Sequence, residues 1–348
     1  MSGFGAGNPP DIVFKFPGNV WAMILVVGGA GFIGSHMVKA LRAAGKDTLV
    51  FDNFERGHEQ ALLGCPYFRG DLRDKEAVQQ VFRDHPIDLV YHFAAYIEVG
   101  ESVENPAGFY QNNVLGTYNL LETMRQADVS NIVFSSTAAV YGEPESVPIG
   151  EDHPKNPTSP YGDTKLAVER MLGAYDRAYG MKSVCLRYFN AAGSDPDCQI
   201  GEEHEPETHL VPRLLLSFQG RANFTVFGDD YDTPDGTCVR DYVHVSDLAD
   251  AHLRAADYLQ SGGSSTAFNL GNGNGYSVNE VVRAAQRVTG ISMQPEIGPR
   301  RAGDPARLVA SNQRAKEILG WEPRYPEIET MVAHTWAWQS SHPRGYGD

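Results

Sequence analysis

The stretch MILVVGGAGFIGS, residues 23–35, determines the predicted fold. Its first half, Met23 to Val27, is apolar and typical of a buried parallel strand, and the glycines that follow end the strand and begin a helix. The apolar face of that helix continues through Met37 and Leu41. A strand, a glycine-rich turn and a helix in this order predict a dinucleotide site, because free N–H groups at the helix N-terminus attract a pyrophosphate. A glycine-rich turn that binds nothing is the alternative.

The glycines of this turn have separate roles in the prediction. Gly28 or Gly29 forms the tight turn, and Gly31 lets the backbone approach a pyrophosphate. Gly34 lets the helix pack closely against the strand. All of these roles depend on the absence of a side chain.

A second short strand, residues 48–51, ends in Asp52, eighteen positions after Gly34. A carboxylate at this distance accepts hydrogen bonds from the ribose hydroxyls of adenosine and repels a 2′-phosphate, so we expect NAD(H) rather than NADP(H). The alternative is a solvated aspartate that only ends a strand.

Composition narrows the possible partners. The chain has 348 residues, 42% of them hydrophobic, and a formal net charge of −15. This length indicates about two domains. The negative charge without any basic run disfavours nucleic acid and anionic membranes as partners, and no stretch approaches the ~20 apolar residues of a membrane helix. The cysteines lie far apart without a C-x-x-C pair, which argues against disulfides and favours the cytoplasm (Cys65, Cys185, Cys198 and Cys238).

The segment HEPETH, residues 204–209, is the one stretch that resembles a metal motif. The histidines of metalloproteases lie at i and i+4 on one helical face, whereas His204 and His209 are five positions apart with Pro206 between them. We therefore predict no metal site.

The order of the elements predicts an α/β fold with a Rossmann-type, doubly wound parallel sheet. Further strands are expected at residues 67–72, 89–95, 131–137 and 183–188, with a helix at 75–84. Each strand ends where ligands bind in such sheets, at the carboxyl edge.

The domain prediction has three parts. Residues 1–22 lack apolar periodicity and resemble neither a signal nor a transit peptide, so we expect a disordered leader. Residues 23–190 form the NAD-binding domain, and residues 191–348 form a smaller α/β substrate domain. Part of residues 240–260 is expected to pack back on the first domain. The second domain holds a group of arginines suited to a diphosphate: Arg240, Arg300, Arg301 and Arg307.

The predicted chemistry depends on the segment YGDTK, residues 161–165. Its spacing places Tyr161 and Lys165 on one face of a helix that begins near Pro160. A free tyrosine with a pKa of ~10 is a poor base, but an adjacent cation favours the phenolate. Lys165, together with an oxidised nicotinamide ring, would be that cation. Thr137, at the end of the strand at 131–137, can donate a hydrogen bond to the same substrate oxygen.

These segments together resemble the extended short-chain dehydrogenase/reductase family, and within it the branch that interconverts UDP-glucose and UDP-galactose. The resemblance runs from Met23 to the C-terminus. It rests on the motifs GGAGFIGSH, FDN, GDLRD, HFAA, VGESVENP, NNVLGT, FSSTAAVYG, SPYGDTK, LRYFNAAG, DGTCVRDYVHVSDLADAH, NLGNG, RRAGDP and LGW. Of these, DGTCVRDYVHV and RRAGDP are specific to the epimerase branch.

The resemblance implies tightly held NAD+ and a set of residues around it. The implied cofactor residues are Phe32, Ile33, Asp52, Asn53, Asp71, Leu72, Phe93, Ala94, Asn112, Lys165 and Phe189. The implied substrate residues around UDP are Asn190, Leu210, Phe227, Arg240, Arg301 and Asp304. The chain departs from the family at Ile97, where some relatives have a lysine, and at His209, where an asparagine often contacts uridine-side groups. Leu308 lies where the resemblance implies a gate beside the C2 substituent of the sugar, so activity on UDP-N-acetylhexosamines is a possible secondary reaction.

The implied reaction is an epimerisation at C4. Tyr161 takes the proton of the C4 hydroxyl while C4 gives hydride to NAD+, the 4-keto sugar turns over, and hydride returns to its other face. The resemblance also implies a homodimer, formed through helices near residues 108–126 and 161–179.

Two other functions remain open at this point. A nucleotide-sugar 4,6-dehydratase needs an acid pair directly after Thr137, where this chain has Ala138 and Ala139. A non-catalytic NAD-sensing relative has no use for Tyr161, Lys165 and Thr137 together.

Overall fold

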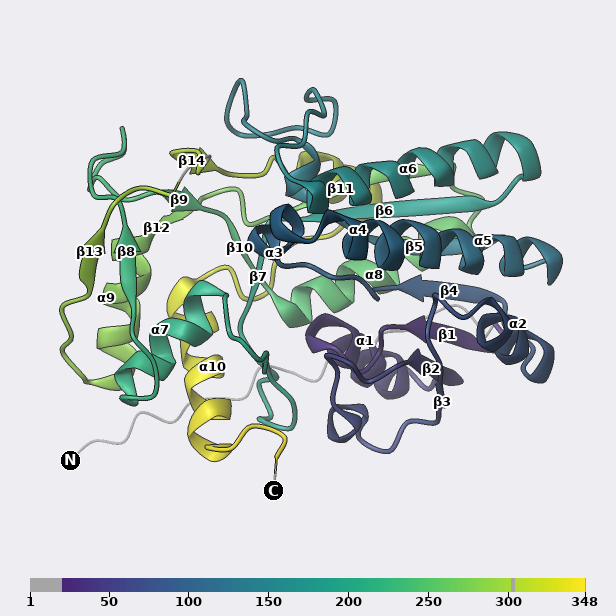
Figure 1. Cartoon of the computed structure of the whole chain (residues 1–348), viewed down its shortest axis with the longest axis horizontal. Helices are drawn as coiled ribbons and strands as arrows, with labels where there is room; N and C mark the ends of the chain where they lie inside the picture. The colour runs from purple at the N-terminus through teal and green to yellow at the C-terminus, as the bar shows by residue number, and fades with distance from the viewer. Residues whose placement is uncertain (1–20, 302–303, 348) are drawn as a thin grey trace.

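The computed structural model describes residues 21–301 and 304–347. Residues 1–20 of the predicted leader lie outside the described residues. At the centre of the described chain is a seven-stranded parallel sheet in the order β11-β6-β5-β4-β1-β2-β3 (Figure 1). Its strands are β1 (Ile24–Val27), β2 (Thr48–Asp52), β3 (Tyr67–Arg69), β4 (Leu89–His92), β5 (Asn131–Thr137), β6 (Lys182–Tyr188) and β11 (Thr266–Leu270).

Helices cover both faces of this sheet, because successive strand residues point to opposite sides. Ile24 and Val26 of β1 pack with α1 (Phe32–Ala43) and α8 (Val245–Gln260). Leu25 and Val27 pack with α2 (Lys75–Asp84), α5 (Gly116–Gln126) and α6 (Pro160–Tyr179) on the other face. The predicted fold class, a Rossmann-type doubly wound parallel sheet, is confirmed.

Two strands are shorter than the apolar runs suggest. The expected strands at residues 67–72 and 89–95 end at Arg69 and His92. The chain leaves the sheet after Arg69 because Asp71 begins a turn, in which its carbonyl accepts from the Asp74 N–H. After His92 it bends across β1, since the N–H groups of Phe93 and Ala94 both bond to the Val27 carbonyl. The residues left over form part of the sheet's carboxyl edge.

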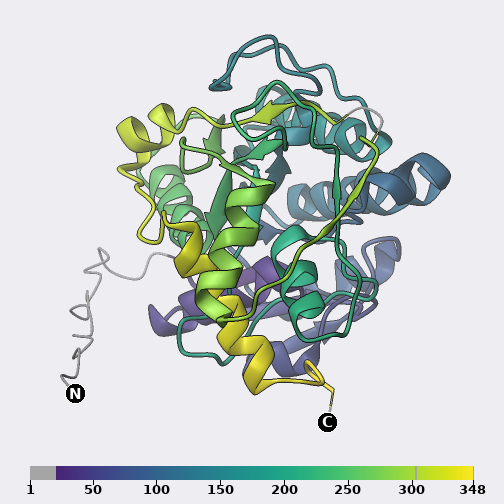
Figure 2. The same ribbon diagram turned by 90° about the vertical axis from the view of Figure 1, so that its left-hand side faces the viewer.

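A smaller body lies beside that edge, at the left of Figure 1. Its core joins α7 (Leu210–Phe218), α9 (Val278–Thr289) and α10 (Ile328–Ser341). Figure 2 shows α9 and α10 in front of the sheet. Short strands complete this body in pairs and threes: β7 (Asn190–Ala192) with β10 (Tyr242–His244), β8 (Thr225–Phe227) with β13 (Glu296–Gly298), and β9 (Val239–Arg240) with β12 (Tyr276–Ser277) and β14 (Arg307–Leu308).

The chain crosses between the two bodies more than once. After β7 it enters the smaller body, and it returns to the sheet with α8 and β11 before it leaves again. The domain division at residue 190 stays a prediction. Two short helices, α3 (Val99–Glu104) and α4 (Pro106–Phe109), and a π-helical turn at residues 110–115 link β4 to α5. In the described parts of the chain, no helix has the length and apolar character that crossing a membrane requires.

Candidate active site

Two adjoining hollows lie along the carboxyl edge of the sheet. The larger is a cavity of about 480 Å³ between the sheet and the smaller body, and the lesser, of about 120 Å³, lies over β1, β2 and β3. Their walls share Gly28, Gly31, Arg56, Phe93, Ala95 and Tyr96. One extended ligand can therefore occupy both.

The glycine turn after β1 forms the junction of the two hollows. Gly28 has φ of 79°, and a Cβ there would lie 2.4 Å from the Ala94 nitrogen, so Gly28 is the residue that forms the tight turn. A Cβ at Gly34 would lie 2.1 Å from the Gly28 carbonyl oxygen, inside the contact of helix and strand. At Gly31 the nearest atom would be 3.6 Å away. The chain itself has room for a side chain at Gly31, which fits a position that approaches a ligand.

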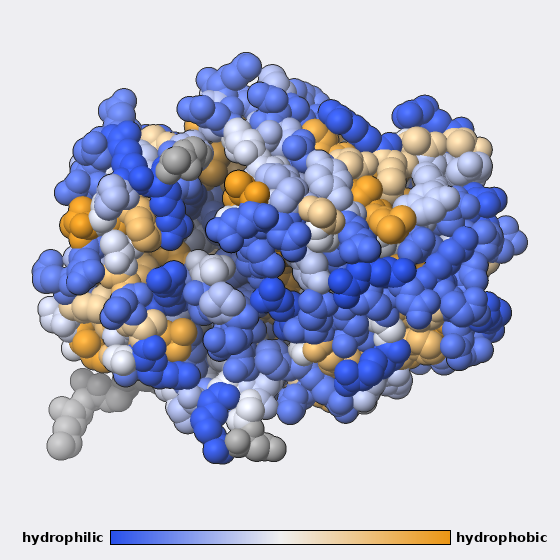
Figure 3. Space-filling model, viewed as in Figure 1, coloured by the Kyte–Doolittle hydropathy of each residue, from blue (hydrophilic) through white to orange (hydrophobic). Residues whose placement is uncertain are grey.

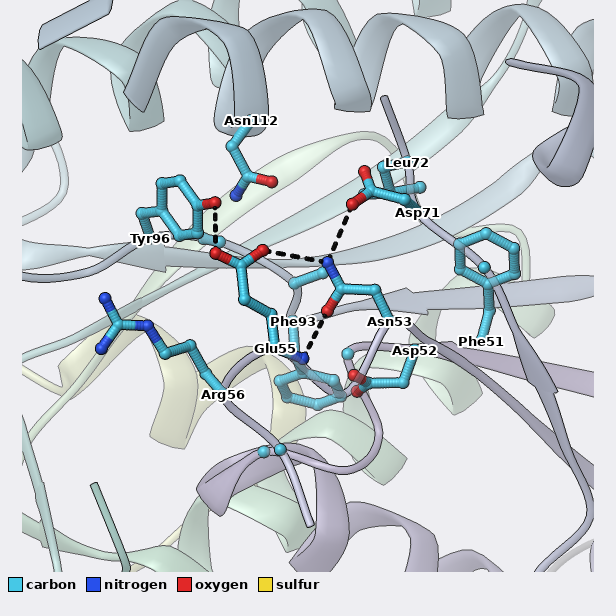
Figure 4. Close-up of a pocket in the computed structure, with 16 residues that line it drawn as sticks. Phe51, Asp52, Asn53, Glu55, Arg56, Asp71, Leu72, Phe93, Tyr96 and Asn112 are labelled. Carbon is cyan, nitrogen blue, oxygen red and sulfur yellow. Dashed lines mark hydrogen bonds between the residues drawn. The ribbon is translucent and has the colours of Figure 1, made fainter. Parts of the chain in front are cut away.

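The lesser hollow is lined by carboxylates from the ends of β2 and β3 (Figure 4). Asp52 is buried, and its two oxygens accept from the N–H groups of Ala30 and Phe54 at 2.9 and 2.8 Å. Burial raises the pKa of Asp52 above its usual value. The backbone bonds hold this carboxylate at the wall in one orientation, as hydroxyl recognition requires.

Asn53 and Asp71 face each other across the same hollow (Figure 4). The Asn53 amide donates to Asp71 at 2.9 Å. A hydrogen bond from Arg73 lowers the pKa of Asp71 to about 2, so this carboxylate is ionised at neutral pH. Phe93, Ala94, Leu72 and Asn112, all predicted as cofactor residues, line the hollow as well.

Three further residues of this wall were not among the predicted ones. Tyr96 donates to Glu55 at 2.8 Å, and Arg56 lines both hollows. Arg56 follows the end of β2 by four residues, so a basic residue in the loop after a strand was the signal that could have identified it. It is a cation at the junction of the hollows, on the same wall as Ile97.

The larger cavity brings together Thr137, Tyr161 and Lys165. The Lys165 ammonium is buried and donates to the Ser135 carbonyl at 2.8 Å, over the Phe134 ring. Thr137 Oγ1 accepts from the Ala139 N–H at 3.1 Å, which leaves its proton for another acceptor. The nearby Tyr161 phenol is a candidate for it, because Thr137 lowers the pKa of that phenol.

Burial acts on both ionisable groups of this triad. It lowers the pKa of Lys165 to about 7 and raises the pKa of Tyr161 to about 12, against the effect of the Thr137 hydrogen bond. In the protein without its cofactor, Lys165 therefore does not lower the pKa of Tyr161 as the sequence predicted. The physical reason is that a low dielectric favours the neutral form of both groups, and the ammonium is directed to a backbone carbonyl instead.

A buried ion pair lies behind this triad and was not predicted. Glu169, one helical turn after Lys165, accepts from Arg187 through both of its oxygens at 2.9 and 2.7 Å. Ser136 donates to the same carboxylate at 2.6 Å. The charge of Glu169 raises the pKa of Lys165 against burial. The i, i+4 spacing of Lys165 and Glu169 was the available signal.

The predicted substrate residues divide into two groups. Asn190, His209, Arg240, Asp304 and Leu308 line the larger cavity, as do the predicted cofactor residues Phe32, Ile33 and Phe189. Within the described residues, Leu210, Phe227 and Arg301 do not line it. Arg301 lies over the Phe227 ring at 4.0 Å, and Leu210 packs in the core of the smaller body.

The predicted arginine group is also divided. Arg240 points into the cavity region, held by the Pro305 carbonyl at 2.9 Å and by Asp304 at 3.5 Å. Arg300 pairs with Asp230 and lies over Tyr231, away from the cavity wall. Of the four arginines, Arg240 is the one that lines the described part of the cavity.

The chain resembles known proteins over most of its length. Residues 24–271 match the NAD dependent epimerase/dehydratase family. The UDP-glucose 4-epimerase of Halalkalibacterium halodurans is 54% identical over 324 residues, which cover 93% of this chain and 97% of the relative.

Solved structures agree with this similarity. A crystal structure of a UDP-glucose 4-epimerase matches with a TM-score of 0.91 and 50% identity, over 94% of this chain and 100% of that chain. The UDP-glucose 4-epimerase of Bifidobacterium longum, solved in complex with NAD+ and UDP, matches with a TM-score of 0.87 and 38% identity, over 93% and 99% of the two chains. The family match covers the glycine turn, Asp52, Thr137, Tyr161 and Lys165. The chain thus belongs to the NAD dependent epimerase/dehydratase family.

Proposed function

We propose that the protein interconverts UDP-glucose and UDP-galactose with bound NAD, as an isomerase. The observation that carries this proposal is the placement of Thr137, Tyr161 and Lys165 on one cavity whose wall continues into the hollow of Asp52. A base and a dinucleotide site in one continuous space are what a C4 oxidation and reduction need. The relatives described above are named UDP-glucose 4-epimerases.

The residues of the lesser hollow fit an NAD molecule. Asp52 and Asn53 would hold the adenosine ribose, Asp71 and Leu72 would lie near adenine, and Gly31 with the start of α1 would hold the pyrophosphate. The Asp52 carboxylate would repel a 2′-phosphate, which favours NAD over NADP. Arg56 would supply the cation that Ile97 does not. Bound NAD supplies a hydride acceptor and donor for the sugar C4 and, when oxidised, a positive charge near the phenol.

The triad would handle the proton of the same reaction. Tyr161 accepts the proton of the C4 hydroxyl and later returns it. Thr137, whose hydroxyl lies beside the phenol and keeps its proton free to donate, would position the shared hydroxyl. Lys165 would be the cation beside the phenol, and the charge of Glu169 raises its pKa against the effect of burial.

The other wall of the cavity would bind the UDP group. Arg240 would bind the diphosphate, with Asn190, His209 and Asp304 near it. Leu308 would lie near the C2 substituent of the sugar, and its modest size supports a secondary activity on UDP-N-acetylhexosamines.

The dehydratase alternative is disfavoured by the wall after Thr137. Ala138 and Ala139 line the cavity where an acid pair would be needed. The NAD-sensing alternative leaves the triad without a role. The experiment that separates the three functions is direct: purified protein should carry NAD with none added and convert UDP-galactose to UDP-glucose without net NADH release. A 4-keto-6-deoxy product, or bound NAD without turnover, would contradict the proposal.

We also propose a homodimer in the cytoplasm. Large apolar side chains are exposed around α5 and the end of α6: Tyr110, Leu115, Tyr118 and Tyr179. Figure 3 shows hydrophobic residues over the helices at the upper right. Such a surface supports burial against a second copy, and light scattering measures the mass. All four cysteines are free thiols, which supports a reducing compartment.

A further inference from the structure

The segment between β7 and α7 brings four side chains of metal-binding type to one point. One nitrogen or oxygen each of Glu202, His204, Glu207 and His209 lies within 4.8 Å of all the others. The sequence argument against a metal considered a helical motif, which needs histidines at i and i+4. A loop has no such period, so histidines five positions apart can converge.

Several separations within this cluster are close to those of a tetrahedral metal site, with each oxygen of Glu207 facing a different histidine. His204 Nδ1 lies 3.3 Å from Glu202 and 3.5 Å from Glu207, and His209 Nδ1 lies 3.7 Å from Glu207. Donors around zinc are about 3.3–3.6 Å apart when the metal–donor bonds are about 2.0–2.2 Å. His209 Nδ1 and Glu202 Oε1 are closer, at 2.5 Å, as in a hydrogen bond. Metal binding would replace that bond and release its proton.

Two donor atoms of the cluster are buried without a partner. Glu202 is 2% exposed, yet its Oε2 has no hydrogen bond. His204 Nδ1 is near both carboxylates without hydrogen-bond geometry to either. A buried carboxylate oxygen without a donor is costly, and a cation is one way to satisfy it. This second observation distinguishes the cluster from acidic residues that merely lie close together.

Charge also favours a divalent cation. In the described part of the chain, Glu202 and Glu207 form ion pairs with His204 and His209 and with no lysine or arginine. Once both imidazoles have released their protons, as metal ligands must, the two carboxylates leave a charge of two negative units, which one divalent ion neutralises. Mixed nitrogen and oxygen donors in this number suit zinc better than calcium or magnesium.

We propose that Glu202, His204, Glu207 and His209 bind one divalent transition-metal ion of the zinc class. Four protein donors close the coordination sphere, so the ion is structural rather than catalytic. It would join the loop to both bodies, because His209 directly precedes α7 and His204 contacts the Phe32 ring at the start of α1. Both histidines line the larger cavity, so the ion stabilises that wall. His209 is about two-fifths exposed and offers an entry path.

The test is a titration of untagged protein, with its NAD retained, with Zn²⁺ after dialysis against a chelator. We expect one Zn²⁺ per chain by calorimetry, a higher melting temperature with Zn²⁺ than with chelator, and four-coordinate absorption when Co²⁺ is used. These measurements do not require turnover. A negative result would therefore contradict the metal site without contradicting the proposed epimerase activity. The proposal would be overturned if calorimetry shows no saturable Zn²⁺ binding. It would also be overturned if the melting temperature is the same with Zn²⁺ as with chelator, because the histidines then keep their protons and bind no metal.

Variants locate the ion. Glu202→Gln and His204→Gln should each weaken Zn²⁺ binding by at least ~10-fold, the loss typical of even an outer-shell partner. The matched control is Glu205→Gln, an exposed carboxylate in the same loop, which should bind as the unchanged protein does. Equal affinity in all three variants would place the ion elsewhere among the 11 histidines. If one variant fails to fold, the stoichiometry of the unchanged protein still decides whether the site exists.

Discussion

The two walls of the active-site space are built in different ways. On the sheet side, Gly28, Asp52, Asp71, Phe93 and Thr137 each lie at or just after the end of a parallel strand, so the sheet itself aligns them. On the other side, the wall combines residues 189–191, 204, 209, 240, 304, 305 and 308, which come from several loops and short strands. The comparison shows that strand register positions the functional side chains of the sheet wall. Tertiary packing of loops positions those of the other wall.

Replacing Tyr161 should give the largest effect on the sheet side. Tyr161→Phe removes the proton acceptor and little contact area, so kcat should fall by ~10²–10⁴-fold while NAD stays bound. Steady-state kinetics and the NAD content of the purified variant measure the two. A variant with more than half the activity would rule out Tyr161 as the base.

Replacements of Thr137, at the end of β5, test whether its hydroxyl or its packing matters for catalysis. Thr137→Ala should lower kcat on the order of 10²-fold, because it removes the hydroxyl donor beside the Tyr161 phenol. Thr137→Ser keeps the hydroxyl and should cost far less. Equal losses in the two variants would point to the methyl group and to packing instead.

A pair of glycine replacements separates folding from ligand binding in the same turn. Gly34→Ala places a Cβ 2.1 Å from the Gly28 carbonyl oxygen, so it should destabilise the fold by ~1–3 kcal/mol and lower the melting temperature. Gly31→Ala meets no atom closer than 3.6 Å, so stability should persist while NAD content falls. Thermal denaturation of the cofactor-free proteins measures stability. The NAD extracted from each purified variant measures cofactor content. Loss of stability in Gly31→Ala would contradict the role of Gly31 in ligand approach.

Leu308 tests the loop side and should give the smallest effect. Leu308→Tyr narrows the wall where an acetamido group would lie, so kcat/KM for the N-acetylated UDP-sugar should fall several-fold relative to the plain sugar, the equivalent of ~1–3 kcal/mol of overpacking. Kinetics with both substrates give the ratio. An unchanged ratio would show that another residue controls access.

Prediction from the sequence was most successful where neighbours in the chain are also neighbours in space. The helix at residues 75–84 and the strand at 131–137 have the predicted limits, because their apolar periodicity and the bounding polar residues act within one element. The substrate wall was harder to predict. Arg301 belongs to the RRAGDP motif and was predicted to bind substrate, yet it stacks on the Phe227 ring. Nothing in the sequence around either residue indicates that contact.

The sequence by itself determined the parallel sheet, the glycine turn and the one-face placement of Tyr161 and Lys165, since each depends on periods of two or 3.6 residues and on glycine's missing side chain. Only the tertiary structure decided the pKa directions of that pair, the buried Glu169–Arg187 pair and the convergence of Glu202, His204, Glu207 and His209. The physical reason is that burial and loop closure depend on distant segments, and no local pattern encodes which segments meet.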